Sequence, residues 1–180
     1  MAATTDDLLD RLLEAIEEGD WDAALGAANG YASVAAALQA VCTSDWSSKA
    51  DASNAAEFLG VLLGSAGAGD FWSADWKRLP LLCSIISNPN FEASGLLSAV
   101  NYLLVNGVDV HATGGTHGSG ALHALAASDI PPATAVRLAL VLIDHGALPN
   151  AEDDEFRTAC MIASELERGE LADTLRCATN

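Results

Sequence analysis

The stretch VNYLLVNGVDVHA at residues 100–112 is repeated in outline by ALVLIDHGALPNA at residues 139–151. Each copy is an apolar run with helical spacing, then a glycine, then a short extended phrase. The glycines, Gly107 and Gly146, lie 39 residues apart. Self-similarity at a fixed spacing is typical of repeat proteins, which stack small units and present a broad binding surface. The pattern therefore predicts repeated helical units and favours binding over catalysis.

Helix-start and helix-stop signals divide the rest of the chain into short paired helices. Gly19 separates the first pair, with Asp20 as the cap of its second helix, while Ser53 or Asn54 and then Thr134 are the expected caps of two later helices. The expected helices cover about residues 6–18, 21–28, 32–42, 55–63, 79–86, 96–105, 121–127, 135–143, 156–165 and 169–177. Abundant alanine, the best helix former, agrees with an all-α fold.

Several of these helices begin with parts of one known motif. The ankyrin family opens its inner helix with T-P-L-H-x-A, and partial matches are LPLL at 79–82, GALH at 120–123 and TACM at 158–161. Residues 142–151 match the family's closing phrase L-L-x-x-G-A-x-x-N-A, and EEGD at 17–20 is similar to its helix junction. The chain thus resembles an ankyrin repeat protein, strongly from about 96 to 176 and weakly from 31 to 70.

The resemblance implies a single domain, 1–180, in which antiparallel helix pairs stack into an ankyrin-like α-solenoid. The repeat spacings of 38 and 41 residues exceed the family's usual length of about 33, and the extra residues fall between the two helices of a pair. The implied units are a capping pair at 1–30, repeats at 31–66, 78–112 and 119–151, and a capping pair at 156–177.

Charge narrows the class of partner. The chain has 25 acidic and 8 basic residues, a formal net charge of −17. Binding to nucleic acid phosphates or to an anionic membrane needs the opposite sign, so we expect neither. Opposite fields speed encounter with a basic protein, which is the partner we expect. The simpler alternative is that the charge only keeps an apolar-rich chain soluble.

The acidic residues gather at both ends of the chain. Residues 1–30 contain eight acids and one base, and residues 151–180 contain eight acids and three bases. Polar ends are what a solenoid requires, because each terminal unit has one face without a neighbour. The middle of the chain is more apolar and forms the expected core.

The four cysteines are far apart in sequence and form no CxxC motif, which favours reduced thiols and a cytoplasmic protein. We expect no signal peptide, because the first residues lack a basic segment followed by an apolar core. We expect no membrane-spanning helix, because no apolar run approaches 18 residues. A monomer is expected when no partner is bound.

Three groups of residues have compositions that could form a phosphate, zinc or calcium site. The loop at 114–120 is rich in glycine, but Ala121 and Leu122 follow its last glycine where a phosphate-binding loop has Lys and Ser/Thr, so we expect a flexible loop between repeats. The histidines His111, His117 and His123 are spaced too widely for structural zinc, and His123 falls on the ankyrin motif, where its ring hydrogen-bonds within the repeat. The run at 153–155 lacks the alternating ligands of a calcium loop and is expected to be a solvated acidic loop. No acid–base pair or activated nucleophile is evident, so we expect neither enzyme activity nor a cofactor nor a metal.

The loop around residues 67–77 is the most distinctive segment for binding. It combines aromatic rings with acidic neighbours, which is typical of interaction hot spots, although the rings could instead pack the loop onto the helices. The predicted partner-binding residues are Trp72, Asp75, Trp76, His117, Asp153, Asp154 and Glu155.

Two other functions remain open. The chain could be an acidic mimic of nucleic acid that blocks a nucleic-acid-binding enzyme, which requires carboxylates along one face. It could also be an enzyme whose site the sequence does not reveal. The favoured hypothesis is a protein-binding module that inhibits, neutralises or chaperones a basic partner.

Overall fold

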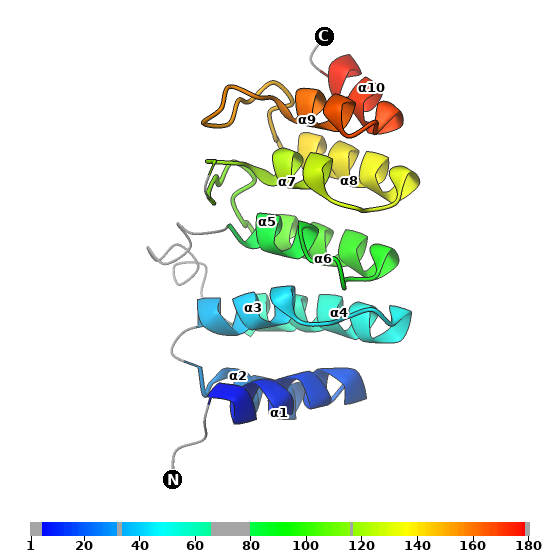
Figure 1. The fold of residues 1–180 in the computed structure, drawn as a ribbon. Coiled ribbons are helices and arrows are strands. Elements are labelled where there is room, and N and C mark those ends of the chain that lie inside the picture. Colours follow the sequence, from blue (N-terminus) through cyan, green and yellow to red (C-terminus); the bar gives the residue numbers. More distant parts are fainter. Residues whose placement is uncertain (1–4, 32–33, 66–79, 116, 179–180) are drawn as a thin grey trace. The chain divides into compact units, whose positions relative to one another are not determined.

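The computed structural model describes residues 5–31, 34–65, 80–115 and 117–178 (Figure 1). The described residues form helices joined by loops and turns, with no β-strand beyond isolated bridges, so the predicted all-α fold is confirmed. The helices are α1 Thr5–Glu18, α2 Trp21–Ala28, α3 Val34–Thr43, α4 Lys49–Ser65, α5 Leu81–Ile86, α6 Ala93–Val105, α7 Ala121–Ala127, α8 Pro132–Asp144, α9 Ala159–Glu165 and α10 Gly169–Cys177. None of these described helices has the length and apolarity needed to cross a membrane.

The chain divides into two compact units. The first unit comprises Met1–Ser73 and Asn90–Gly107, and the second comprises Ala74–Pro89 and Val108–Asn180. The predicted repeat at 78–112 is divided between them, with α5 in the second unit and α6 in the first. The solenoid arrangement of the whole chain stays a prediction.

The first unit has α4 at its centre, in contact with α1, α2, α3 and α6. Its core is fully buried and contains Leu12, Ile16, Leu38, Phe58 and Leu103. Trp46 has no exposed surface, although its neighbours in the sequence are polar, and its indole Nε1 donates to the carbonyl of Val41 at 2.6 Å. Its backbone pairs with residues 90 and 92, so this ring is structural and offers nothing to a partner.

Small residues bring α4 and α6 unusually close. A Cβ atom built on Gly95 of α6 would lie 2.5 Å from Ala52 Cβ and 2.7 Å from the Ala52 backbone. Two helices can approach this closely only where one of them has no side chain at the crossing. Gly95 is therefore a packing requirement of the first unit.

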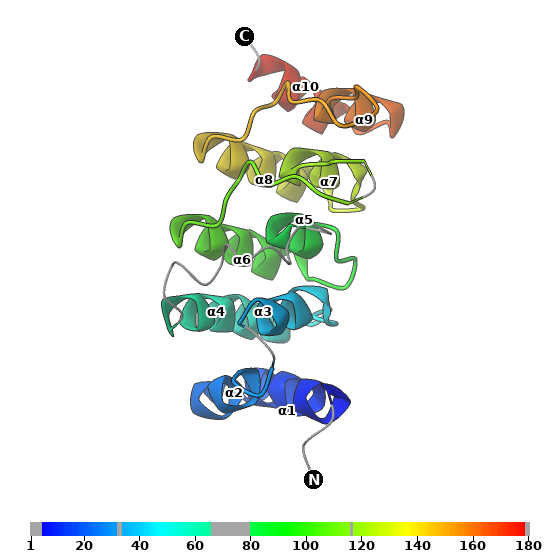
Figure 2. The ribbon, with the colours of Figure 1, turned by 90° about the vertical axis from the view of Figure 1, so that its left-hand side faces the viewer.

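The second unit is built from stacked helical hairpins. Helix α7 contacts α8 within one hairpin, and α9 contacts α10 within the next. The first helices of successive hairpins stack on one another, and so do the second helices. Helices α5, α7 and α9 form one row, and α8 and α10 form the other. Figures 1 and 2 show the loops that precede α7 and α9 projecting on the same side of this unit.

An arginine from the last hairpin caps α7. The Arg168 guanidinium donates to four backbone carbonyls at or just beyond the C-terminus of α7, those of Leu125, Ala126, Ser128 and Ile130. Burial lowers the pKa of Arg168, and the carboxylate of Asp129 partly offsets this effect. These bonds satisfy carbonyls that a helix end leaves without partners, and they join the two hairpins.

Several helices begin earlier or later than the sequence predicted, because other residues cap them. Helix α4 starts at Lys49 rather than 55, with Ser48 Oγ accepting from the Asp51 amide. Helix α6 starts at Ala93, where the Glu92 carboxylate accepts from two amides. Helix α8 starts at Pro132, a favourable first position because proline has no N–H group that would need an acceptor there. Helix α9 starts only at Ala159, capped by Thr158 Oγ1.

Candidate functional site

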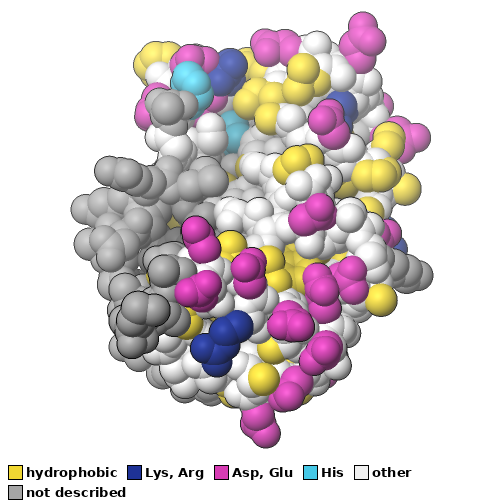
Figure 3. All heavy atoms as spheres, turned by 60° about the horizontal axis from the view of Figure 1, so that its bottom comes forward, with side chains coloured by type: hydrophobic (Ala, Val, Ile, Leu, Met, Phe, Trp, Pro, Cys, Tyr) yellow, Lys and Arg dark blue, Asp and Glu magenta, His cyan; other side chains and the backbone are white. Residues whose placement is uncertain are grey.

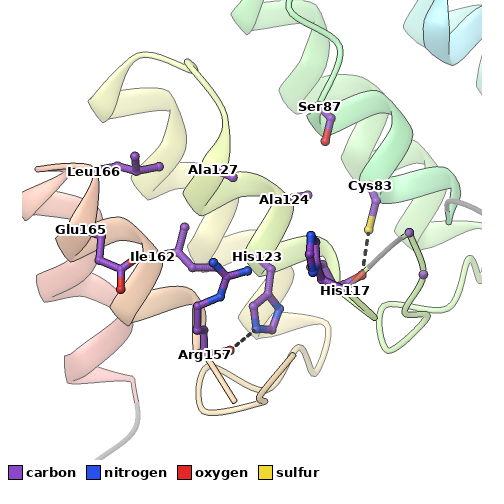
Figure 4. A pocket seen from close by; sticks show the side chains of 13 residues that line it. Cys83, Ser87, His117, His123, Ala124, Ala127, Arg157, Ile162, Glu165 and Leu166 are labelled. Carbon is purple, nitrogen blue, oxygen red and sulfur yellow. Dashed lines mark hydrogen bonds between the residues drawn. The ribbon is translucent and has the colours of Figure 1, made fainter. Parts of the chain in front are cut away.

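An open pocket of about 410 Å³ lies in the second unit, between α7, α9 and the loops that precede them (Figure 4). Ala124 and Ala127 of α7 line it opposite Ile162 and Leu166 of the last hairpin. Polar side chains line the rest of the pocket, and these are Cys83, Ser87, His117, Ser119, His123, Arg157 and Glu165. The pocket therefore combines apolar side chains from α7 and the last hairpin with polar side chains from α5 and its C-terminus, α7, α9 and the loops.

The loop before α9 is organised by the carboxylate of Asp153, whose side chain has no exposed surface. Its Oδ1 accepts from the backbone amides of Glu155 and Arg157, each at 2.9 Å. Its Oδ2 accepts from Arg157 Nε at 3.1 Å and from Nη2 at 2.9 Å. A buried carboxylate with four donors is well satisfied, so Asp153 holds the loop in one conformation.

The charge states follow from these bonds. Burial alone raises the pKa of Asp153, but hydrogen bonds from Arg157 and from the Glu155 amide outweigh it, and the pKa lies below its usual value. The hydrogen bond to Asp153 raises the pKa of Arg157. Both groups are therefore charged at neutral pH. The predicted solvated acidic loop is wrong for Asp153, whose carboxylate faces the loop interior.

The loops before α7 and α9 are joined to one another. Glu155 Oε1 lies 3.0 Å from His117 Nδ1, and Glu155 Oε2 lies 2.9 Å from Arg157 Nη2. The Asp154 amide donates to the His117 carbonyl at 2.9 Å. The Asp154 carboxylate lies directly over Gly118, where a Cβ atom would come within 2.9 Å of it. The loops can nest in this way because Gly118 has a positive φ and no side chain.

His123 links the start of α7 to the following loop. Its Nδ1 accepts from the Gly120 amide at 3.3 Å, so its Nε2 carries the proton and donates to the Arg157 carbonyl at 3.0 Å. The ring thus bonds within its own repeat, as the sequence motif implied, and also to the next loop. Both ring nitrogens are engaged, which leaves no lone pair for a metal.

Phe156 follows directly after the predicted contact residues Asp153, Asp154 and Glu155 but was not predicted to be one of them. It has a φ of 59°, and 77% of its surface is exposed. A bulky residue in the left-handed region is strained, and such strain persists only where the surroundings impose it. The helical spacing of the apolar residues had placed Phe156 inside a helix. An aromatic residue directly after a run of acids was the available signal.

The structure describes four of the seven predicted contact residues. Trp72, Asp75 and Trp76 lie outside the described residues and stay predictions. The structure brings His117, Asp154 and Glu155 together at the two joined loops, and Asp153 lies beneath them. Whether any of them contacts a partner stays a prediction.

The buried cysteine thiols offer little reactivity. Burial raises the pKa of the Cys83 thiol to about 12, and its sulfur lies 3.7 Å from the Ser119 carbonyl. Burial also raises the pKa of the Cys42 thiol in the first unit. Neither thiol is a nucleophile near neutral pH. None of the four cysteines forms a disulfide, and within the described ranges no group of His, Cys, Asp and Glu is arranged to hold a metal ion.

No known protein-family model matches the chain, and no curated protein sequence matches it closely enough to count as a relative.

Proposed function

We propose that this chain is a non-enzymatic interaction module of the ankyrin type that binds a basic protein. The observation that carries the proposal is the stacking in the second unit, where α7 lies on α9 and α8 lies on α10, with the preceding loops on one side. Stacked hairpins of this kind present loops and one row of helices as a continuous surface. The His123 bonds, at the position of the ankyrin motif, support the same assignment.

The polar groups of the pocket support binding rather than catalysis. The hydrogen bonds of Asp153, Arg157 and His123 hold the loops together. The Cys83 thiol is protonated, because burial raises its pKa. A catalytic acid, base or nucleophile needs a reactive group available to substrate at the working pH. The groups in this pocket instead build a stable surface.

Charge supports a basic partner. The exposed carboxylates of the second unit include Glu152, Asp154, Glu165 and Glu170, and the whole chain has a net charge of −17. An acidic surface accelerates association with a basic protein and weakens the complex as salt rises.

The test begins with the tagged chain and an extract of the cells that make it. Retained proteins are identified, produced as recombinant proteins, and titrated against the purified chain at low and high salt. We expect a basic protein whose Kd rises with salt. An acidic partner, or a Kd that is indifferent to salt, would contradict the proposal.

Two sets of variants then locate the contact. Trp72→Ala with Trp76→Ala tests the aromatic segment, and Glu152→Gln with Asp154→Asn tests the loop before α9. The matched control is Glu170→Gln with Asp173→Asn, which removes the same charge from exposed positions on α10. We expect the control to retain the wild-type Kd after correction for net charge.

A second function is favoured by one observation on the first unit. The acidic residues of α1, α2 and the turn between them are all exposed, with Arg11 as the one base in this hairpin. Figure 3 shows acidic side chains spread over this face. Such a face suits an acidic mimic of nucleic acid. The test is competition between the chain and DNA for the captured partner, and undiminished DNA binding would remove this function.

A further inference from the structure

The exposed side chain of Phe156 is held by bonds on both sides of it. The Phe156 amide donates to the Asp153 carbonyl at 3.0 Å, and the Arg157 amide donates to the Asp153 carboxylate at 2.9 Å. The Asp153 amide in turn donates to the Arg157 carbonyl at 3.0 Å. This closed turn fixes a positive φ at Phe156 and leaves the ring in solvent. The hydrogen bonds of buried Asp153 and of Arg157 thus hold the Phe156 ring in an exposed position.

The charges around the ring are strongly unequal. Arg157, the one base of this loop, is neutralised by Asp153 and by Glu155. Glu152 and Asp154 are exposed and form no ion pair with the residues that the structure describes. A cation that approaches the ring therefore meets uncompensated negative charge on the same loop.

Resting on the proposed function, we propose that Phe156 and the exposed carboxylates of Glu152 and Asp154 form a docking point for an arginine-containing, extended segment of the basic partner. A guanidinium stacks flat on an aromatic face and also forms paired hydrogen bonds with a carboxylate. Lysine offers a point charge that is more strongly hydrated and lacks the planar face. The combination of an exposed ring and neighbouring carboxylates therefore selects arginine over lysine.

The first unit supplies an internal comparison. The hairpin of α1 and α2 carries eight exposed carboxylates, yet none of its described apolar side chains is among the large exposed hydrophobic residues. Charge alone would direct a basic peptide to that hairpin. A preference for the loop before α9 would have to come from Phe156.

The experiment uses the full chain, labelled with ¹⁵N, and short synthetic peptides that alternate Gly and Ser with Arg, Lys or Glu. We expect amide shifts centred on residues 152–157 with the Arg peptide, weaker binding of the Lys peptide and none of the Glu peptide. Phe156→Trp should bind the Arg peptide at least as tightly as the wild type. Phe156→Leu, which keeps apolar surface but lacks a ring, should bind it about fivefold more weakly.

Phe156→Gly removes the ring without threatening the fold, because glycine adopts a positive φ at little cost. We expect an unchanged or higher Tm and the same loss of peptide binding as in Phe156→Leu. Leu140→Ala on α8, which truncates another exposed apolar residue of the second unit, is the matched control and should bind normally.

The outcomes separate this inference from the function on which it rests. Shifts confined to α1 and α2, with Phe156→Gly binding normally, would overturn the docking point and leave a basic partner in place. Equal affinity for the Arg and Lys peptides would overturn the role of the ring. The absence of binding by either basic peptide, even at low salt, would contradict both proposals.

Discussion

The two units join their helices by different means. In the first unit, α4 and α6 meet through small side chains, with Gly95 against Ala52 and no room between them. In the second unit, polar side chains bond to backbone groups, either across hairpins and loops, as Arg168 and His123 do, or within one loop, as Asp153 does. The first unit should therefore be sensitive to added volume, and the second to the loss of a hydrogen-bonding group.

The largest effect is expected at Asp153, because Asp153→Asn removes the buried negative charge and replaces Oδ2, the acceptor of two bonds from Arg157, with an NH2 group that cannot accept. Asp153→Asn should lower the Tm more than any other single change described here. Its pKa is lowered in the folded state, so its contribution to stability is complete above the unfolded pKa of about 3.9 and is lost as pH falls through the lowered value.

Urea denaturation of wild type and Asp153→Asn between pH 7 and pH 2 measures this contribution. The difference in unfolding free energy between the two proteins should be constant near neutral pH and shrink on acidification. A difference that grows toward low pH would contradict the assignment of a charged, hydrogen-bonded Asp153.

The next effect is at Arg168, which holds the carbonyls at the end of α7. Arg168→Met keeps the apolar stem but loses every donor, and we expect a decrease of about 3 kcal/mol in unfolding free energy. Arg176→Met is the control, since its ion pair with Asp173 is exposed and should be worth less than about 1 kcal/mol. Equal losses in the two variants would show that the bonds from Arg168 to the end of α7 stabilise the second unit no more than an exposed ion pair does.

Gly95→Ala tests the first unit. The added methyl group would meet the Ala52 backbone, which cannot move aside as a side chain can, so we expect a loss of about 2 kcal/mol. Gly26→Ala in α2 is the matched control, because nothing lies within 4 Å of its Cβ position. The control should gain about 0.5–1 kcal/mol from helix propensity. Chemical denaturation of both variants measures the contrast.

The smallest changes in unfolding free energy are expected at two equivalent turns, one in each unit. Gly19 between α1 and α2 has a φ of 72°, and Glu167 between α9 and α10 has a φ of 57°. Glu167→Gly should therefore stabilise the protein by about 1 kcal/mol, and Gly19→Ala should destabilise it by a similar amount. A loss of stability in Glu167→Gly would show that the glutamate side chain has a role beyond the turn.

Sequence patterns predicted the existence of the helices better than their starting points, and the predicted pairing of α5 with α6 stays unsupported because the two helices belong to different units. Asp20 was recognised as a cap, whereas the start of α9 was placed at 156 although Thr158 stands in the TACM match. Ser48 was missed because Ser53 and Asn54 offer equally good local caps, and only packing decides among them. The burial of Trp46 cannot be read from its neighbours in sequence, because the segment that its backbone pairs with lies more than 40 residues later in the chain.

The candidate site was only partly predictable for a related reason. The acids at 153–155 stood out, but their roles depend on contacts that the local pattern does not encode. Asp153 and Arg157 have the spacing of a helical ion pair and yet form one within a loop. A positive φ at Phe156 arises from that loop, since nothing in phenylalanine itself favours it.

The bonds from the last hairpin back to α7 have a consequence for biosynthesis. The His123 ring finds its acceptor 34 residues downstream, and the Leu125 carbonyl finds its donor 43 residues downstream. When α7 leaves the ribosome, these groups are still solvated by water. Helix α7 therefore has its full set of native hydrogen bonds only after residue 168 has emerged, and a nascent chain completes its second unit late.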